Sequence, residues 1–341
     1  MSKLAFITGI TGQDGSYLSE LLIEKGYKVY GIVRRTSLLY SHTRLDHIRD
    51  ELHLTYGDLT DNAGLTTYIG KIIDENSNYE VLEIYNLAAQ SHVGISFQLP
   101  EYTSDVDGLG VLRLLEIIKN LKPEDRDKVK FYQACTSELF GDVLETPQNE
   151  NTPFNPVSPY AAAKQYGYQI TKIYREAYNL FAVNGILFNH ESPRRGENFV
   201  TMKIVNGVKD IVSGNRQYIT LGNLDSKRDW GHAKDYVYGM WLMMQRGNPV
   251  DYVLSTGRSY SVREFVERCF RHKEINIRWI GNGLEEVGVD DSGTIRVKIN
   301  ERFFRPCEVQ LLLGDCSKAE RELGWVKEFD TLDKLIVDMF E

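Results

Sequence analysis

Short apolar runs alternate with longer amphipathic stretches through the first half of the chain, and this alternation restricts the folds available to it. The run lengths suit buried strands that are each followed by a helix. Right-handed crossovers between such strands produce a parallel sheet with helices on both faces. We therefore predict a doubly wound α/β fold. The predicted strands are Leu4–Thr8, Lys28–Val33, His53–Tyr56, Glu83–Leu87, Lys130–Thr136 and Asn184–Phe188, and the predicted helices are Ser16–Lys25, Ala63–Glu75, Tyr102–Asn120 and Pro159–Tyr178.

The pattern loosens after Phe188, where glycines and a proline separate shorter elements. A helix at 232–245 and a strand at 251–255 indicate a return to the first sheet. We expect residues 1–188 with about 222–255 to form a dinucleotide-binding domain. Residues from about 189–221 with 256–341 would form a smaller, partly interleaved α/β domain for the substrate. Within it we predict a mobile loop at 281–300, which is rich in Gly, Asp and Glu, and short helices at 262–270, 316–323 and 332–340.

Composition restricts the kind of protein. The 341 residues are 42% hydrophobic, which suffices for one or two large domains, and the net charge of −8 argues against nucleic acid as a partner. The four cysteines form no CxxC pair, and no HExxH motif or Cys/His cluster indicates a metal. The N-terminus does not resemble a signal peptide, and no apolar run approaches the ~20 residues of a membrane span. We expect a cytoplasmic protein without metal or membrane contact.

A glycine-rich turn with the sequence GITGQDG follows the first predicted strand and precedes the first helix. There, glycines permit a tight turn and a close approach of the backbone to a pyrophosphate, which the helix N-terminus attracts. The spacing is GxxGxxG rather than GxGxxG, and an ordinary strand–helix turn is the alternative. The context favours a Rossmann-type dinucleotide site made by Gly9, Thr11, Gly12, Gln13, Asp14 and Gly15.

The second predicted strand ends at Arg34 and Arg35, where an NAD-binding chain typically carries an acidic residue for the ribose. Two arginines suit a 2′-phosphate, so we predict NADP, the alternative being a solvated basic pair. Later strand ends contribute further candidates for cofactor contacts, although each of these could serve only in packing. They are Asp58 and Leu59 after the third strand and Leu87, Ala88, Ala89, Gln90 and Ser91 after the fourth.

Tyr160 and Lys164 are four residues apart at the start of a predicted helix, so they share one face. An ammonium there can lower the pKa of the phenol, which makes a base for alcohol oxidation by a nicotinamide. Thr136 and Glu138 lie where the fifth predicted strand ends and should enter the same crevice. The threonine hydroxyl can bind the reacting oxygen, and the carboxylate can move a proton. The alternatives are a surface helix pair for Tyr160 and Lys164 and helix capping for Glu138.

Seven segments together resemble the extended short-chain dehydrogenase/reductases, and most closely the family of GDP-mannose 4,6-dehydratases. The resemblance spans nearly the whole chain, and its longest strings, NHESPRRG at 189–196 and KRDWGHAKDY at 227–236, are the most specific. Cys135 stands where the family has serine, and Met202 where it has arginine. The second difference could alter substrate or subunit contacts. The other segments are GITGQDG, Arg34-Arg35, LAAQSHV, TSELFG and SPYAAAK.

The resemblance implies a dehydratase that converts GDP-mannose to GDP-4-keto-6-deoxymannose. Tyr160, held by Lys164, would take the 4-hydroxyl proton while hydride passes to NADP⁺, and Thr136 would bind O4. Glu138 would remove the C5 proton and assist loss of water from C6. Tyr102, His190 and Arg195 would contact the cofactor. Candidate substrate contacts are Ser91, Glu138, Asn189, Lys203, Arg228 and Arg305. For the two arginines, a structural salt bridge is the alternative.

The resemblance also implies self-association as a homodimer or homotetramer, in which the loop from about Arg34 to Arg44 reaches a neighbouring subunit's cofactor site. Two other functions remain open. A 4-epimerase or a 4-keto reductase of the same fold would need Tyr160 and Lys164 but not Glu138, and a side reductase activity is compatible with the same site. A non-catalytic NADP sensor would be expected to have lost at least one of the three residues, all of which are present.

Overall fold

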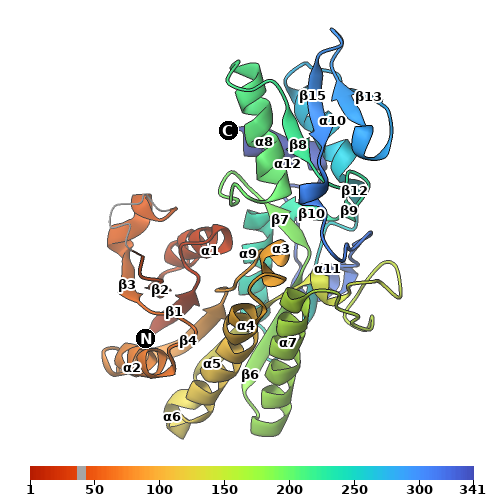
Figure 1. Ribbon diagram of the computed structural model, residues 1–341. Coiled ribbons are helices and arrows are strands. Elements are labelled where there is room, and N and C mark those ends of the chain that lie inside the picture. The colour runs from red at the N-terminus through yellow and green to blue at the C-terminus, as the bar shows by residue number, and fades with distance from the viewer. Residues whose placement is uncertain (37–43) are drawn as a thin grey trace.

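The computed structural model describes residues 1–36 and 44–341, and its centre is a parallel sheet (Figure 1). The strands of this sheet are β1 (Ser2–Thr8), β2 (Tyr27–Val33), β3 (Leu52–Tyr56), β4 (Tyr79–Asn86), β5 (Val129–Thr136), β6 (Phe181–Leu187) and β11 (Tyr252–Leu254). They lie in the order β11-β6-β5-β4-β1-β2-β3, and all neighbours are parallel. The predicted doubly wound α/β fold is confirmed.

The strand order reverses at β1, which lies between β2 and β4. In such sheets a ligand crevice opens at the carboxyl ends of the strands beside the reversal. The two strand ends are joined there, because Thr8 Oγ1 donates to Asn86 Oδ1 at 2.6 Å and accepts from the backbone N–H groups of Leu87 and Ala88 at 3.1 Å. The hydroxyl of Thr8 therefore fixes the start of the loop that leaves β4.

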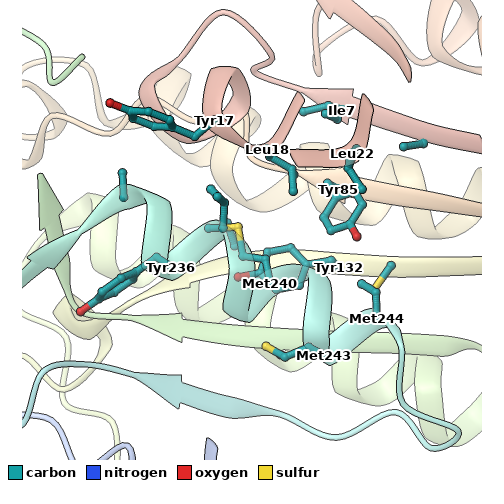
Figure 2. Close-up of a cluster of buried hydrophobic side chains, with 14 of the residues drawn as sticks. Ile7, Tyr17, Leu18, Leu22, Tyr85, Tyr132, Tyr236, Met240, Met243 and Met244 are labelled. Atoms are coloured by element: carbon teal, nitrogen blue, oxygen red, sulfur yellow. The ribbon is translucent and has the colours of Figure 1, made fainter. Parts of the chain in front are cut away.

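Helices cover both faces of the sheet, as the amphipathic stretches predicted. One face packs against α1 (Gln13–Glu24) and α9 (Ala233–Met244). The other face packs against α2 (Asn62–Asp74), α5 (Gly110–Lys119) and α7 (Pro159–Tyr178). The first of these cores is shown in Figure 2, where side chains of α1, α9 and the strands meet. Among them are Leu18 and Leu22 of α1, Met240 and Met244 of α9, and Tyr85 and Tyr132 of the strands.

The helix predicted at 102–120 is interrupted. It divides into α4 (Pro100–Ser104), a one-turn π-helix η2 (Asp105–Leu109) and α5. Gly108 lies against α7, because a Cβ at this position would be in ordinary contact with the carbonyl oxygen of Ala163 at 3.5 Å. A π turn widens the helix by one residue, which rotates the side chains that follow and is frequent at functional sites. Periodicity alone does not reveal such an insertion.

A second, smaller sheet lies in the part of the chain beyond β6. Its strands are β8 (Ile219–Leu221), β13 (Arg278–Ile280), β14 (Val287–Val289) and β15 (Ile295–Ile299), in the order β13-β14-β15-β8. The prediction of a loop at 281–300 is therefore wrong. Val297 is fully buried in this sheet's core, and the polar residues that suggested a loop form a tight turn, in which Gly293 N donates to Asp290 O at 2.9 Å.

The remaining elements connect these two sheets or pack on the smaller one. The division into two domains stays a prediction. Among the short strands, β7 pairs with β10 and β9 with β12. These elements are η1 (Asp46–Glu51), α3 (Val93–Ser96), α6 (Pro123–Arg126), η3 (Ser137–Leu139), β7 (Asn189–Glu191), α8 (Val200–Val212), β9 (Lys227–Arg228), β10 (Trp230–His232), β12 (Tyr260–Ser261), α10 (Val262–His272), η4 (Gly283–Glu285), η5 (Glu301–Phe303), α11 (Ser317–Leu323) and α12 (Leu332–Phe340).

Candidate active site

A cavity of about 940 Å³ opens at the carboxyl ends of the main sheet and extends to residues of the smaller sheet's layer. All predicted site residues line it except Arg35 and Gln90. The structure thus brings together residues from almost the whole length of the chain. The predicted residues that line the cavity are Gly9, Thr11, Gly12, Gln13, Asp14, Gly15, Arg34, Asp58, Leu59, Leu87, Ala88, Ala89, Ser91, Tyr102, Thr136, Glu138, Tyr160, Lys164, Asn189, His190, Arg195, Lys203, Arg228 and Arg305.

The glycine turn leaves its backbone open to a ligand. Gly9 has φ +69°, a conformation that favours glycine, and a Cβ there would lie 2.8 Å from the backbone of Ala88. The N-cap of α1 is Gly12, and no side chain caps the helix. The first N–H groups of α1 therefore face the cavity without a capping side chain, which suits a phosphate group. The residues present fit a dinucleotide.

Gly15 gives the most direct test of this turn. A Cβ at Gly15 would lie 2.4 Å from Gly9 O and 2.6 Å from Ile10 Cα, both backbone atoms that cannot rotate away. We expect Gly15→Ala to lower the free energy of unfolding by about 3 kcal/mol and to weaken dinucleotide binding. Gly70→Ala is the control, since a Cβ at this α2 position meets nothing within 4 Å and should stabilise the protein by up to ~1 kcal/mol. Urea unfolding and a fluorescence titration with a reduced nicotinamide dinucleotide measure both effects, and equal stability of the two variants would contradict the prediction.

Two predicted cofactor residues are held by protein groups across the cavity. Gln13 Nε2 donates to His190 O at 3.0 Å, and Ser192 Oγ donates to Gln13 Oε1 at 2.8 Å. Asp14 Oδ2 lies 2.8 Å from His190 Nε2. Burial opposes both charges, but the mutual attraction of the two groups prevails, lowering the pKa of Asp14 and raising the pKa of His190. These side chains join the glycine turn to β7.

The arginines after β2 differ in position. Arg34 lines the cavity and its Nη1 donates to the Tyr102 hydroxyl at 2.8 Å. Arg35 does not line the cavity, and its guanidinium lies 4.9 Å from the centre of the Tyr56 ring. Residues 37–43, the greater part of the loop expected to reach a neighbouring subunit, lie outside the described residues. Arg34 is thus the better-placed of the two for a cofactor phosphate.

Gln90 supports the loop after β4 rather than lining the cavity. Its amide Nε2 donates to His92 O at 3.2 Å and to Thr103 Oγ1 at 3.1 Å. Its backbone N–H donates to Asp107 Oδ1 at 2.7 Å. These bonds fix the loop to α4 and η2, so that the small residues Ala88 and Ala89 line the cavity without bulky neighbours.

The tyrosine–lysine pair lies at the centre of the cavity. Ser158 Oγ caps α7 by accepting from Ala161 N at 3.1 Å, which sets Tyr160 and Lys164 on the buried side of its first turns. Lys164 Nζ donates to Ala134 O at 3.1 Å and lies 5.9 Å from the centre of the Tyr160 ring. The surface helix pair is thereby excluded, because Tyr160 is only 8% exposed and Lys164 only 3%.

The expectation that the ammonium lowers the pKa of Tyr160 is not met. Burial raises that pKa, and the nearby carboxylate of Asp107 raises it further, while a hydrogen bond with Thr136 acts in the opposite direction. The physical reason is that Lys164 points to the Ala134 carbonyl. The four-residue spacing correctly predicted that Tyr160 and Lys164 share one face of the helix. It could not predict the burial of the phenol or the nearby charge of Asp107, which both raise the pKa of Tyr160.

Glu138 lies in η3, immediately after β5, and is 8% exposed. The cap of this turn is Thr136, whose Oγ1 accepts from Glu138 N at 3.2 Å. The Glu138 carboxylate lines the cavity, with Arg305 Nη1 4.0 Å away. Capping of the turn is thus done by Thr136, which leaves the carboxylate of Glu138 available to a ligand.

Cations line the part of the cavity beyond β6. Arg228 pairs with Glu308 at 3.2 Å, and Arg305 lies 3.7 Å from the same carboxylate, so both arginines form salt bridges here while facing the cavity. Burial, with nearby arginines, lowers the pKa of Lys203 to about 8. Asn189 Oδ1 is buried without a hydrogen-bond partner among the described residues. Such groups suit a polar, anionic ligand.

The two positions at which the sequence departs from the family pattern are both buried. Cys135 Sγ contacts Asn184 Oδ1 at 3.4 Å, and Met202 of α8 packs in the apolar core between the smaller sheet and its helices. Sequence reasoning did not identify several other cavity residues, because they lie in loops or short elements without periodicity. Two of them, His92 and Glu191, could have been found from their position within the recognised motifs. The full set is His92, Glu191, Phe199, Arg302, Phe303, Phe304 and Glu308.

Within residues 1–36 and 44–341, no group of three or more His, Cys, Asp or Glu side chains is arranged to hold a metal ion. A search of the same residues for a helix of sufficient length and apolarity to cross a bilayer finds none.

A dinucleotide-type glycine turn that shares one cavity with a buried tyrosine–lysine pair defines an enzyme of the short-chain dehydrogenase/reductase class. A family model described as GDP-mannose 4,6 dehydratase matches residues 6–339. The chain belongs to this family. It is therefore an enzyme of the nucleotide-sugar dehydratase group, a set of hydro-lyases.

Curated relatives agree with the family model over nearly the full chain. The GDP-mannose 4,6 dehydratase of Drosophila melanogaster is 54% identical over 99% of this chain and 85% of its own length. The human protein of the same name is also 54% identical, with 99% and 90% covered. Among solved structures, a dTDP-glucose 4,6-dehydratase from Bacillus anthracis in complex with NAD has a TM-score of 0.77 at 19% identity, with 99% of this chain and 96% of that chain covered. This last likeness supports the fold.

Proposed function

We propose that this chain converts GDP-mannose to GDP-4-keto-6-deoxymannose and water, a step in the synthesis of GDP-deoxyhexoses such as GDP-fucose or GDP-rhamnose. One observation carries the proposal. A buried carboxylate, Glu138, lines the same cavity as Tyr160, Lys164 and Thr136. Oxidation of an alcohol requires only the last three, whereas elimination of water also requires a group that moves protons at neighbouring carbons. The likeness to relatives named for this reaction supports the same conclusion.

Each residue has a defined task in the proposed reaction. Tyr160 takes the proton of the 4-hydroxyl, and Thr136 hydrogen-bonds O4. The 4-keto group then acidifies the C5 proton, which Glu138 removes, and the same carboxyl donates a proton to the 6-hydroxyl as it leaves as water. One proton is delivered to C5 when C6 is reduced, and release of the proton that Tyr160 took from the 4-hydroxyl balances it, so that the net change is the loss of water. A bound nicotinamide dinucleotide supplies the redox chemistry, accepting hydride from C4 and returning it to C6.

The nucleotide sugar is expected to bind in the cation-rich part of the cavity. Lys203, Arg228 and Arg305 are candidate contacts for the diphosphate, and the free Oδ1 of Asn189 is an acceptor for a hydroxyl or amide. Ser91 on the opposite wall is a further candidate contact. Binding of a diphosphate would give Arg305 an alternative partner to Glu138 and Glu308, which lie 4.0 and 3.7 Å from its Nη1.

Incubation with GDP-mannose and NADP⁺ tests the proposed function. Mass spectrometry should detect a 4-keto-6-deoxy sugar nucleotide, and no net NADPH should be produced, because hydride leaves and returns within one turnover. Formation of a C4 epimer, or stoichiometric NADPH, would contradict the proposal. Addition of NADPH to the completed reaction then shows whether the product is reduced further to GDP-rhamnose.

We infer that the cofactor is NADP, on the support of Arg34. This arginine lines the cavity beside Tyr102, and no acidic residue follows β2 at the corresponding place. We expect Arg34→Ala to weaken NADP⁺ binding about tenfold to a hundredfold and to leave NAD⁺ binding nearly unchanged. Arg35→Ala, which removes the neighbouring charge outside the cavity lining, should have the smaller effect. Fluorescence titrations with both dinucleotides measure this, and equal losses for NAD⁺ and NADP⁺ in Arg34→Ala would refute the assignment.

We also propose self-association as a dimer or tetramer. Tyr166 and Ile173 are exposed apolar residues seven positions apart on α7, and Leu109 is exposed on the adjacent η2. Residues at this spacing lie on one face of a helix, and exposed apolar side chains gathered on one face favour contact with a partner. Sedimentation velocity of the purified chain would give the oligomeric state.

A further inference from the structure

Asp107 is a buried carboxylate beside the tyrosine–lysine pair for which the proposed reaction gives no role. It lies in the π turn η2 and is 1% exposed. Its Oδ1 accepts from Gln90 N at 2.7 Å, whereas its Oδ2 is buried without a hydrogen-bond partner among the described residues. A buried carboxylate oxygen without a partner is costly and unusual in a folded protein. The cost suggests that this oxygen acts on a neighbouring charge.

The neighbouring charge is Lys164. Burial raises the pKa of Asp107 to about 6, and the positive charge of Lys164 opposes part of this rise. Lys164 is 3% exposed, and the only hydrogen bond that the structure shows for its ammonium is the one to Ala134 O at 3.1 Å. An ammonium has three N–H groups, so further donors remain. A buried ammonium also needs a counter-charge. Asp107 can supply one from η2, which packs against α7 at Gly167, although no ion pair joins the Asp107 and Lys164 side chains among the described residues.

The backbone around Asp107 is built to hold it against α7. Gly167, one turn beyond Lys164, brings α7 close to η2, because a Cβ at Gly167 would lie 3.2 Å from Asp107 O. Without the π turn, the register of the helix would direct residue 107 elsewhere. The same carboxylate holds the backbone of Gln90 and thus the loop that lines the cavity. Asp107 therefore links three parts of the site.

We propose that Asp107 is a positioning residue for the proposed reaction, a buried counter-charge that η2 places near the ammonium of Lys164, without a direct ion pair, and that biases the ionisation of Tyr160. The proposal rests on the proposed function, since it concerns the base that starts that reaction. Other charges also face Tyr160, namely Glu138 in η3 and Arg195 beyond β7. They remain in place when Asp107 is changed.

Asp107→Asn tests the proposal, because the amide oxygen can still accept from Gln90 N while the charge is lost. Removal of a negative charge near Tyr160 makes its phenolate easier to form. In a plot of kcat against pH, the acidic limb is the range in which kcat rises with pH. The apparent pKa of this limb should fall by about one pH unit. A weaker base and the loss of the counter-charge near Lys164 should also lower kcat about tenfold on the plateau, with KM for GDP-mannose, NADPH affinity and melting temperature nearly unchanged.

Glu83→Gln is the matched control, because Glu83 is also 1% exposed but binds Tyr27, Tyr85 and Gln245 away from the cavity. The acidic limb of its kcat–pH profile should have the same apparent pKa as in the wild-type enzyme. If Asp107→Asn does not fold, Asp107→Ser gives the same comparison with a hydroxyl acceptor. An unshifted limb in an active Asp107 variant would overturn the proposal, as would a loss explained by melting temperature or NADPH affinity alone. A wild-type enzyme that does not turn over GDP-mannose would instead refute the proposed function.

Discussion

Glu138→Gln is expected to reduce formation of the 4-keto-6-deoxy product about a thousandfold while leaving NADPH binding intact. The amide has the size of the carboxylate but can neither remove the C5 proton nor return one to the departing 6-hydroxyl. Oxidation at C4 needs Tyr160, Lys164 and Thr136, which the change does not touch. The variant should therefore retain the first half of the reaction, visible as absorbance of enzyme-bound NADPH when GDP-mannose is added to the NADP⁺ complex.

The control for this variant is Glu150→Gln. Glu150 lies in the loop between η3 and α7, where its Oε1 accepts from Val253 N at 2.8 Å, and it does not line the cavity. Its glutamine variant keeps that acceptor and should turn over normally. Exchange of the C5 hydrogen with deuterated water gives a second measurement, since it requires the base but not the loss of water. Full turnover or normal C5 exchange in Glu138→Gln would remove Glu138 from the proposed mechanism.

The sequence predicted the main sheet well because its signal is local. Each strand is a short apolar run, and each crossover helix has its own amphipathic period, so order and direction follow from right-handed connections. The smaller sheet was harder to predict. Strands β14 and β15 are short, and the Asp290–Gly293 turn between them suggested a loop by composition. Pairing of β15 with β8, in which Val297 lies opposite Ile219, 78 residues earlier, depends on contacts that no local pattern contains.

The candidate site likewise contains residues that the local sequence could predict and residues that it could not. Residues that follow strand ends, such as Thr136 and Glu138, could be placed from sequence because parallel strands all direct their carboxyl ends to one edge. The family resemblance added residues beyond β6, including Arg228 and Arg305. Neither source predicted Asp107, because a π turn shifts its direction within an otherwise regular helix. Ionisation could not be predicted at all, since the pKa of Tyr160 depends on burial and on charges from distant segments.

Tyr160→Phe is expected to lower turnover about a thousandfold through the step that precedes the one blocked in Glu138→Gln. The ring stays in place, so folding and NADPH binding should be retained, but no group remains to take the 4-hydroxyl proton. Tyr168→Phe is the control, because Tyr168 is equally buried on α7 and does not line the cavity.

The two catalytic variants should therefore differ in kind. Addition of GDP-mannose to NADP⁺-loaded Tyr160→Phe should give neither bound NADPH nor C5 exchange, because the C5 proton becomes acidic only after C4 is oxidised. Glu138→Gln should give bound NADPH without exchange. If Tyr160→Phe still formed NADPH at the wild-type rate, another group would have to be the base, and the pairing of Tyr160 with Lys164 and Asp107 would lose its proposed purpose. The order of the two half-reactions thus follows from which signal each variant keeps.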